Sequence, residues 1–314
     1  MKKMRCVFIG LLCLILFLTS CSINRMAMNM VANALTSDGS AEVFTGDSDP
    51  ELVGDALPFA IKMYEALLSQ NPNHQGLINM TGSMFVMYAN AFVQGPAEML
   101  PFYMFEERQA AQDRAKNLYL RGLELLTRGL ELKYRGFSTA FADGRLPEFL
   151  SRMRKADVPA LYWSAAAGFL AYSIDLLDFE LSARIPEWTA MIHRAYELDP
   201  NFNVAAFDEF FIIFYASLPE LLGGDVERAR YHFRRALEKT DGNSASAFVS
   251  YAQAISVPAQ DYDTFREHLE KALAIDVDRD VSTRLVNIMS QRRAQWMLNH
   301  AWTFFSFLPF PDDF

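Results

Sequence analysis

The stretch GGDVERARYHFRRALEKTDG, residues 223–242, decides the fold class of this chain. Ala229, Phe233 and Ala236 are spaced four and three residues apart, so they lie on one face of an α-helix with arginines on its flanks. Asp225 is a suitable N-cap, and the final glycine ends the helix. This spacing places an aromatic residue between two small ones. The pattern is typical of the second helix of a tetratricopeptide-type hairpin, where the small residues let the neighbouring helix approach closely.

The same spacing recurs elsewhere in the chain. Equivalent sets are Ala60, Tyr64 and Leu67, then Trp188, Ile192 and Ala195, and then Phe265, Leu269 and Ala272. Each set is followed, after a short turn, by another apolar helix, at a period that is irregular but near the roughly 34 residues of tetratricopeptide repeats. Alternating runs typical of strands are nearly absent. The sequence therefore predicts an all-α fold in which degenerate tetratricopeptide-like helical hairpins form an α-solenoid, or superhelix.

The N-terminus has the features of a processing segment. Lys2, Lys3 and Arg5 form a positive region, and the apolar run that follows is too short for a comfortable membrane span. Leu18-Thr19-Ser20-Cys21 resembles the bacterial lipoprotein box, in which the cysteine is acylated. We expect residues 1–20 to be a lipoprotein signal peptide and Cys21 to anchor the protein by lipid to a bacterial membrane, on the periplasmic side. An ordinary signal peptide with a chance cysteine is the alternative.

The mature chain divides into a tether and one domain. Residues 36–50 are polar, acidic and rich in turn formers, so we assign residues 21–51 to the lipidated N-terminus and tether. No second linker of similar length follows, and residues 52–314 are expected to form a single helical-repeat domain. A long helix is predicted over 105–134, and a terminal helix over 281–307 that caps the stack.

Charge and cysteine content exclude several functions. The chain has 29 basic and 38 acidic residues, a net charge of −9, and an acidic protein is a poor candidate for binding nucleic acid. The only cysteines are Cys6, Cys13 and Cys21, so the mature protein would have no free thiol, no disulfide and no cysteine nucleophile.

Motifs of catalysis and cofactor binding are missing. The sequence has no phosphate-binding glycine loop, no Gly-x-Ser-x-Gly and no His-Glu-x-x-His, and no glutamate is followed by serine as in some helical peptidoglycan-cleaving proteins. His193 and Glu197 could share a metal, but a solvated helix pair is the better interpretation because a third ligand is lacking. Asp208 and Glu209 are interpreted as a polar edge that faces a turn. We expect no enzymatic activity, no metal and no cofactor.

The first helices of the hairpins supply the candidate binding surface. Aligning them on the tetratricopeptide pattern turns ten side chains toward a concave groove. These are Asn79, Ser83, Tyr162, Phe169, Tyr172, Phe207, Phe211, Phe214, Tyr215 and Phe248. Such a groove would be aromatic and apolar and would suit a partner or a hydrophobic ligand. The alternative left open is that the rings pack against the long helix or the C-terminal cap.

Several segments in order resemble one protein family. They are ALPFAIKMYEALLSQNPN from Ala56, MYANAFVQGPAEM from Met87, RAKNLYLRGLELLTRGLE from Arg114, RAYELDPN from Arg194 and LGGDVERARYHFRRAL from Leu222. With the lipoprotein box, they resemble the lipoprotein T component of tripartite ATP-independent periplasmic (TRAP) transporters associated with tetratricopeptide proteins. The resemblance covers the chain from about Asp49 to Trp296.

This resemblance implies an all-helical protein that forms a homo-oligomer, a trimer, and a complex with the periplasmic solute-binding subunit of the transporter. It carries over no catalytic residues. The leading interpretation is a membrane-anchored, non-enzymatic transport accessory. A scaffold for outer-membrane or envelope protein assembly is the alternative, and an undetected cell-wall hydrolase is the third reading.

Overall fold

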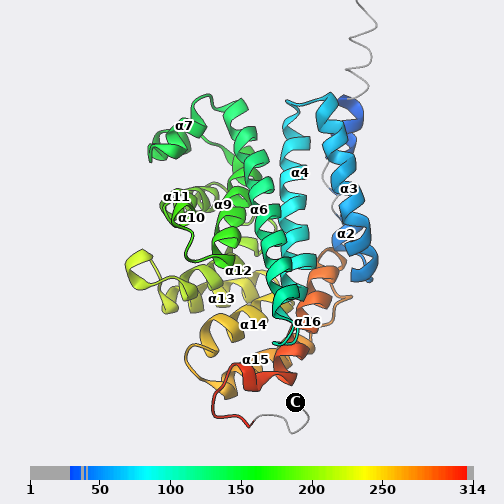
Figure 1. Cartoon of the computed structure of the whole chain (residues 1–314), viewed down its shortest axis with the longest axis vertical. Coiled ribbons are helices and arrows are strands. Elements are labelled where there is room, and N and C mark those ends of the chain that lie inside the picture. The colour runs from blue at the N-terminus through cyan, green and yellow to red at the C-terminus, as the bar shows by residue number, and fades with distance from the viewer. Residues whose placement is uncertain (1–28, 37–38, 40–41, 310–314) are drawn as a thin grey trace, which may run out of the picture.

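The computed structural model describes residues 29–36, 39 and 42–309 (Figure 1). All regular elements of this part of the chain are helical, which confirms the all-α class. They are α2 (Glu42–Thr45), α3 (Pro50–Gln70), α4 (Gln75–Tyr88), α5 (Gly95–Glu98), α6 (Phe105–Lys133), α7 (Phe137–Ala142), α8 (Leu146–Leu150), α9 (Val158–Ile174), α10 (Phe179–Ser182), α11 (Ile185–Leu198), α12 (Ala206–Ser217), α13 (Val226–Lys239), α14 (Ala245–Tyr251), α15 (Tyr262–Leu273) and α16 (Arg284–Asn299). The expected signal peptide and Cys21 lie outside the described residues.

The helices pack mainly against their neighbours in the sequence. In the upper part of Figure 1, α3, α4, α6, α9 and α11 lie side by side, each in contact with the next. Below them, α12 pairs with α13, and α14 pairs with α15. The last helix, α16, packs on α14 and α15 and also contacts α2 and α3. The two ends of the helical chain therefore meet.

The helix α13 forms as its sequence predicts. The Asp225 carboxylate accepts a hydrogen bond from the backbone N–H of Arg228 at 3.0 Å, which is an N-cap contact. Ala229, Phe233 and Ala236 are all buried, so the predicted apolar face is the face that packs. The predicted long helix is α6, and the predicted terminal helix is α16 with a short 3₁₀ turn after it.

Close helix contacts depend on residues without a large side chain. At Gly122 of α6, a Cβ would lie 2.8 Å from the carbonyl oxygen of Gly82 of α4, which is closer than real Cβ contacts. The backbones of α4 and α6 can therefore meet only because both positions are glycine. This contact fixes the relative placement of two long helices in the body.

Part of the segment expected to be a tether is folded. The helix α3 begins at Pro50, with Asp49 as its N-cap, and α2 precedes it. Residues 42–51 contact α16: the Arg284 guanidinium donates to the Gly46 carbonyl oxygen at 3.0 Å, and Arg292 forms an ion pair with Glu51 at 2.5 Å. These residues belong to the helical body because α16 returns to cover them.

Candidate functional site

A layer of aromatic rings joins the upper and lower groups of helices. Four rings of α12, namely Phe207, Phe211, Phe214 and Tyr215, are buried against α9, α11 and α13. The centroid of Phe211 lies 5.3 Å from that of His193, and the centroid of Phe214 lies 5.3 Å from that of Phe169. Ring pairs at such separations add about 0.5–1.5 kcal/mol each beyond the area they bury. The layer therefore holds the two groups of helices together.

One edge of this layer reaches solvent. Tyr162, Phe169 and Phe210 are only partly buried, and Ile213 of α12 is exposed. The Phe210 centroid lies 5.7 Å from that of Phe169 and 6.3 Å from that of Tyr162. We call Tyr162, Phe169, Phe210 and Ile213 the aromatic strip. Its members are accessible in this structure, so they can contact a bound molecule.

The ten predicted groove residues fall into two groups. Asn79, Tyr162, Phe169 and Tyr172 are half-buried, whereas Ser83, Phe207, Phe211, Phe214, Tyr215 and Phe248 are buried in the chain. The structure brings the residues of α9 and α12 together in the aromatic layer. The hydroxyl of Ser83 donates to the Met80 carbonyl oxygen of its own helix at 3.0 Å, and the ring of Phe248 contacts Phe233 and His268.

The sequence alignment missed Phe210, which lies between the buried rings and solvent. It follows Phe207 by three residues, so its place on the same side of α12 could have been inferred from helical spacing. The accessible aromatic surface therefore differs in part from the predicted groove.

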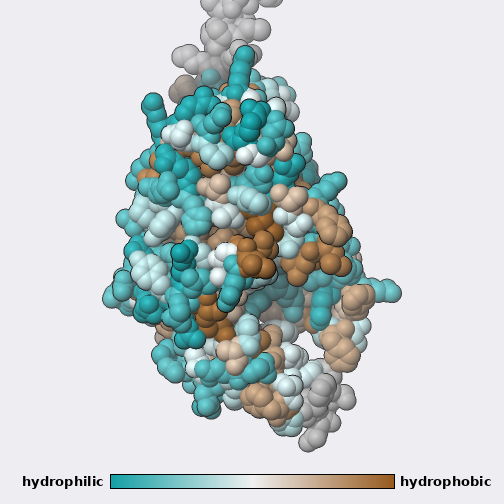
Figure 2. All heavy atoms as spheres, turned by 90° about the vertical axis from the view of Figure 1, so that its left-hand side faces the viewer, coloured by the Kyte–Doolittle hydropathy of each residue, from teal (hydrophilic) through white to brown (hydrophobic). Residues whose placement is uncertain are grey.

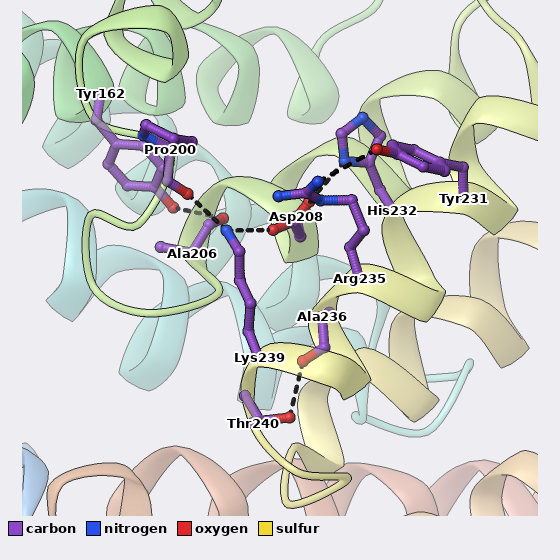
Figure 3. A network of polar contacts seen from close by, with 10 residues as sticks. All are labelled: Tyr162, Pro200, Ala206, Asp208, Tyr231, His232, Arg235, Ala236, Lys239 and Thr240. Atoms are coloured by element: carbon purple, nitrogen blue, oxygen red, sulfur yellow. Dashed lines mark hydrogen bonds and ion pairs between the residues drawn. The ribbon is translucent and has the colours of Figure 1, made fainter.

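Asp208 forms the most deeply buried charged contact in the described chain, shown in Figure 3. Its Oδ1 accepts from His232 Nδ1 at 2.7 Å and from Arg235 Nε at 3.2 Å, and its Oδ2 forms an ion pair with Lys239 Nζ at 2.7 Å. Burial alone would raise the pKa of this carboxyl, but the contacts with His232 and Lys239 outweigh it and hold the pKa below its usual value. The carboxylate is therefore charged and fastens α12 to α13.

The neighbouring acid, Glu209, points to a different helix. Its carboxyl oxygens accept hydrogen bonds from the hydroxyls of Ser244 at 2.6 Å and Ser246 at 2.7 Å, at the start of α14. Burial raises the pKa of Glu209. Asp208 and Glu209 therefore do not act as a pair of acids, and Asp208 is not the turn-facing polar residue that the sequence suggests.

A second polar cluster lies where α16 meets two π-helical turns, η1 (Ala89–Gln94) and η4 (Ala252–Ser256). Arg293 donates to the carboxylate of Glu98 at 2.5 Å and to the side-chain oxygen of Gln253 at 3.0 Å. Gln94 donates to the same carboxylate at 2.8 Å and accepts from the hydroxyl of Tyr119 at 2.6 Å. π-Helical turns are rare and frequently occur at functional sites.

His193 and Glu197, interpreted from the sequence as a solvated helix pair, have different contacts in the structure. The ring of His193 stacks on Phe211, and burial lowers the pKa of this histidine. Glu197 forms an ion pair with Arg194 at 2.9 Å instead. Within the described residues, no group of three histidine, cysteine or carboxylate side chains is placed to hold a metal. No helix in that part of the chain is both long enough and apolar enough to cross a membrane.

Comparison with known proteins places this chain in a family. A family described as "TRAP transporter T-component" matches residues 46–305. A protein of Treponema pallidum (strain Nichols), described only as uncharacterized, is 35% identical over 315 residues, which span 96% of this chain and 97% of that protein. The matched region contains the aromatic layer, the Asp208 network and the helix α16. The chain therefore belongs to the TRAP transporter T-component family.

Proposed function

We propose that this protein is a membrane-anchored periplasmic accessory of a TRAP-type solute transporter and that it binds the solute-binding subunit without catalysing a reaction. The observation that carries this proposal is the family match across residues 46–305, which spans nearly the whole helical body. The lipid at Cys21 would hold the protein on the membrane. Its helical hairpins would be degenerate tetratricopeptide-like repeats. The family resemblance further implies that the protein assembles as a homo-oligomer, a trimer.

The docking surface proposed for the solute-binding subunit is the edge formed by two loops. Five of its apolar residues are exposed: Leu176, Leu177 and Phe179 after α9, and Leu221 and Leu222 after α12. Figure 2 shows hydrophobic side chains gathered at mid-height of the face that carries these loops. Exposed apolar groups that cluster in this way are typical of protein-binding surfaces.

Charge at this edge indicates the character of the partner. Glu180 and Glu220 flank the apolar loop residues and are exposed. A partner that buries Leu177 and Phe179 would gain most from an apolar centre surrounded by lysine and arginine, because like charges across an interface are unfavourable. The proposed contact is therefore apolar at its centre and acidic at its rim on this chain.

The aromatic strip is proposed to bind a hydrophobic ligand. Three accessible rings and Ile213 offer apolar surface, while Glu209 and its two serine partners provide hydrogen-bonding groups near one end. An apolar surface with a few polar groups is the usual composition of a small-molecule site. Asn79 and Tyr172 remain predicted groove residues at other positions of the first helices.

A pull-down of the mature protein with the solute-binding subunit encoded beside it tests the proposed role. We expect the wild type to retain the subunit, and Phe179→Glu to lose it because a charge would enter the apolar contact. Glu238→Gln, an exposed change on α13, is the control and should bind as the wild type does. Failure of the wild type to retain any solute-binding protein would overturn the proposal. Binding of unfolded membrane-protein segments in its place would favour the envelope-assembly scaffold.

A further inference from the structure

Glu209 lies on the open face of α12, beside the aromatic strip. Ile213 follows it by four residues and Ala206 precedes it by three, so the three side chains lie on one face of the helix. Ile213 is exposed, and Ala206 and Glu209 are half-buried. The hydroxyl of Tyr162 reaches this face from α9 and donates to the Ala206 carbonyl oxygen at 3.4 Å (Figure 3).

The charge of the Glu209 carboxyl group acts on the ring of Tyr162. The pKa of Tyr162 is raised chiefly by burial and, second, by the negative charge of Glu209. A carboxylate disfavours the phenolate form only when it lies close by, since charge–charge interactions weaken with distance. Glu209 and the tyrosine at one end of the aromatic strip are therefore neighbours in space.

The two adjacent acids of α12 have different surroundings. Asp208 contacts three basic side chains, which balance its charge. Glu209 accepts hydrogen bonds from the hydroxyls of Ser244 and Ser246, and none of the basic side chains that the structure describes forms an ion pair with it. Each of its carboxyl oxygens keeps a second acceptor position. Glu209 is therefore a half-buried acid that can still take a cation.

We propose that the ligand of the aromatic strip is a cationic amphiphile, whose ammonium group pairs with Glu209 and whose apolar body lies on Phe169, Phe210 and Ile213. This inference rests on the hydrophobic ligand site of the proposed function and adds the charge of its ligand. An ammonium group supplies the positive charge that Glu209 lacks and donates to the remaining acceptor positions of the carboxylate. The faces of Tyr162 and Phe210 attract the same cation.

The charge of Glu209 discriminates among amphiphiles. A ligand carboxylate would face Glu209 with a like charge, so an anionic amphiphile such as a fatty acid should bind least tightly. A neutral alcohol would bury the same apolar area but leave the carboxylate without a cation, so its affinity should be intermediate. The expected order of affinity is therefore amine, alcohol, acid.

Three probes with the same eight-carbon chain test this order: octylamine, 1-octanol and octanoate. Isothermal titration calorimetry at pH 7.5 uses the chain from Ser22 onward, which keeps all described residues. We expect octylamine to bind roughly tenfold more tightly than octanol, because a hydrogen bond to a charged group is stronger than one between neutral groups. Equal affinities for octylamine and octanol, or tighter binding of octanoate than of octylamine, would overturn the inference.

Glu209→Gln tests the residue, since it removes the charge and keeps the size of the side chain. This variant should lower the octylamine affinity roughly tenfold, to near that of octanol, and change the octanol affinity much less. Glu238→Gln, the same substitution at an exposed site of α13, is the matched control and should alter neither affinity. An octylamine affinity that Glu209→Gln leaves intact would refute the pairing.

Phe210→Ala separates this inference from the ligand site on which it rests. It should weaken the binding of octylamine and octanol alike, because both probes lose the same apolar contact. Ile213→Ala, on the exposed side of α12, gives the same comparison if Phe210→Ala does not fold. Octanol binding that depends on these residues, without a preference for octylamine, would overturn the ammonium pairing alone. If none of the three probes binds, the ligand site at the strip is refuted as well.

Discussion

Gly168 of α9 lies directly against the indole ring of Trp188 of α11, so that a Cβ at position 168 would be 2.2 Å from Trp188 Cε2. Both residues are buried, and the ring cannot move away without disturbing the neighbouring rings. We expect Gly168→Ala to lower the free energy of unfolding by about 1–3 kcal/mol through overpacking. Chemical denaturation of the two proteins measures this. Ser173→Ala, on the exposed side of the same helix, is the control.

Removal of the buried carboxylate at position 208 should be more damaging. Asp208→Ala would leave Lys239, Arg235 and His232 around a site without its negative charge. Breaking a buried charge pair in this way costs roughly 3–5 kcal/mol. Denaturant unfolding of Asp208→Ala should show this loss. A change as small as that of the exposed control Glu238→Gln would mean that the network does not fasten α12 to α13.

Two half-buried histidines predict how stability depends on pH. Burial lowers the pKa of both His193 and His268 in the folded protein, so the unfolded chain binds protons first as the pH falls. Their contribution to stability is therefore intact above pH 6.5 and is lost as the pH falls below that value. We expect the Tm to drop between pH 7.5 and pH 5.5, and less so in His193→Gln and His268→Gln.

Two carboxyls provide the comparison for this pH dependence. The pKa of Asp208 is lowered, so its stabilising contribution disappears only at more acidic pH. Burial raises the pKa of Glu209 in the folded protein. Its contribution to stability therefore has the opposite pH dependence: it is present at low pH and is lost as the pH rises through the raised pKa. Glu209→Gln should therefore steepen the loss of Tm toward acid pH. A Tm that is independent of pH in the histidine variants and the wild type alike would refute the assignment.

The ion pairs that join α16 to α3 and α5 should stabilise the protein less as the salt concentration rises. Arg293 and Glu98 join α16 to α5, and Arg292 and Glu51 join it to α3, through partly or fully exposed ion pairs. Because salt screens such pairs, Glu98→Gln should lower the Tm by about 2–4 °C in dilute buffer and by less in high salt. Thermal melts at two ionic strengths measure this. Exchange of the pair, by Glu98→Arg with Arg293→Glu, should recover part of the loss.

Two predicted groove residues should behave differently when truncated. Phe211 is buried among the rings of α11, α12 and α13, so Phe211→Ala should cost roughly 3–5 kcal/mol of stability. Tyr172 is only half-buried, and Tyr172→Ala should leave the Tm within a few degrees of the wild type. Equal losses in both variants would show that Tyr172 also belongs to the core.

Much of the helical framework follows from local sequence. The Asp225 cap and the faces of α13 were predictable, because capping and helical spacing act within a few residues. The position of Phe248 was not, since it depends on how α13 and α15 close around α14. The exposure of Phe210, beside its buried neighbour Phe211, likewise depends on helices distant in the sequence.

The sequence by itself determined the all-α class, the long helix α6 and the terminal helix α16, because hydrophobic period and stop signals are local properties of the chain. Only the tertiary structure decided that most aromatic residues of α12 are core, that Asp208 and Glu209 serve different helices, and that α16 returns to α3. Each of these outcomes depends on contacts between segments far apart in the chain, whose geometry is set by packing. The outer face of α3 is the clearest case, since the spacing of Leu52 and Phe59 can be read from the sequence and their exposure cannot.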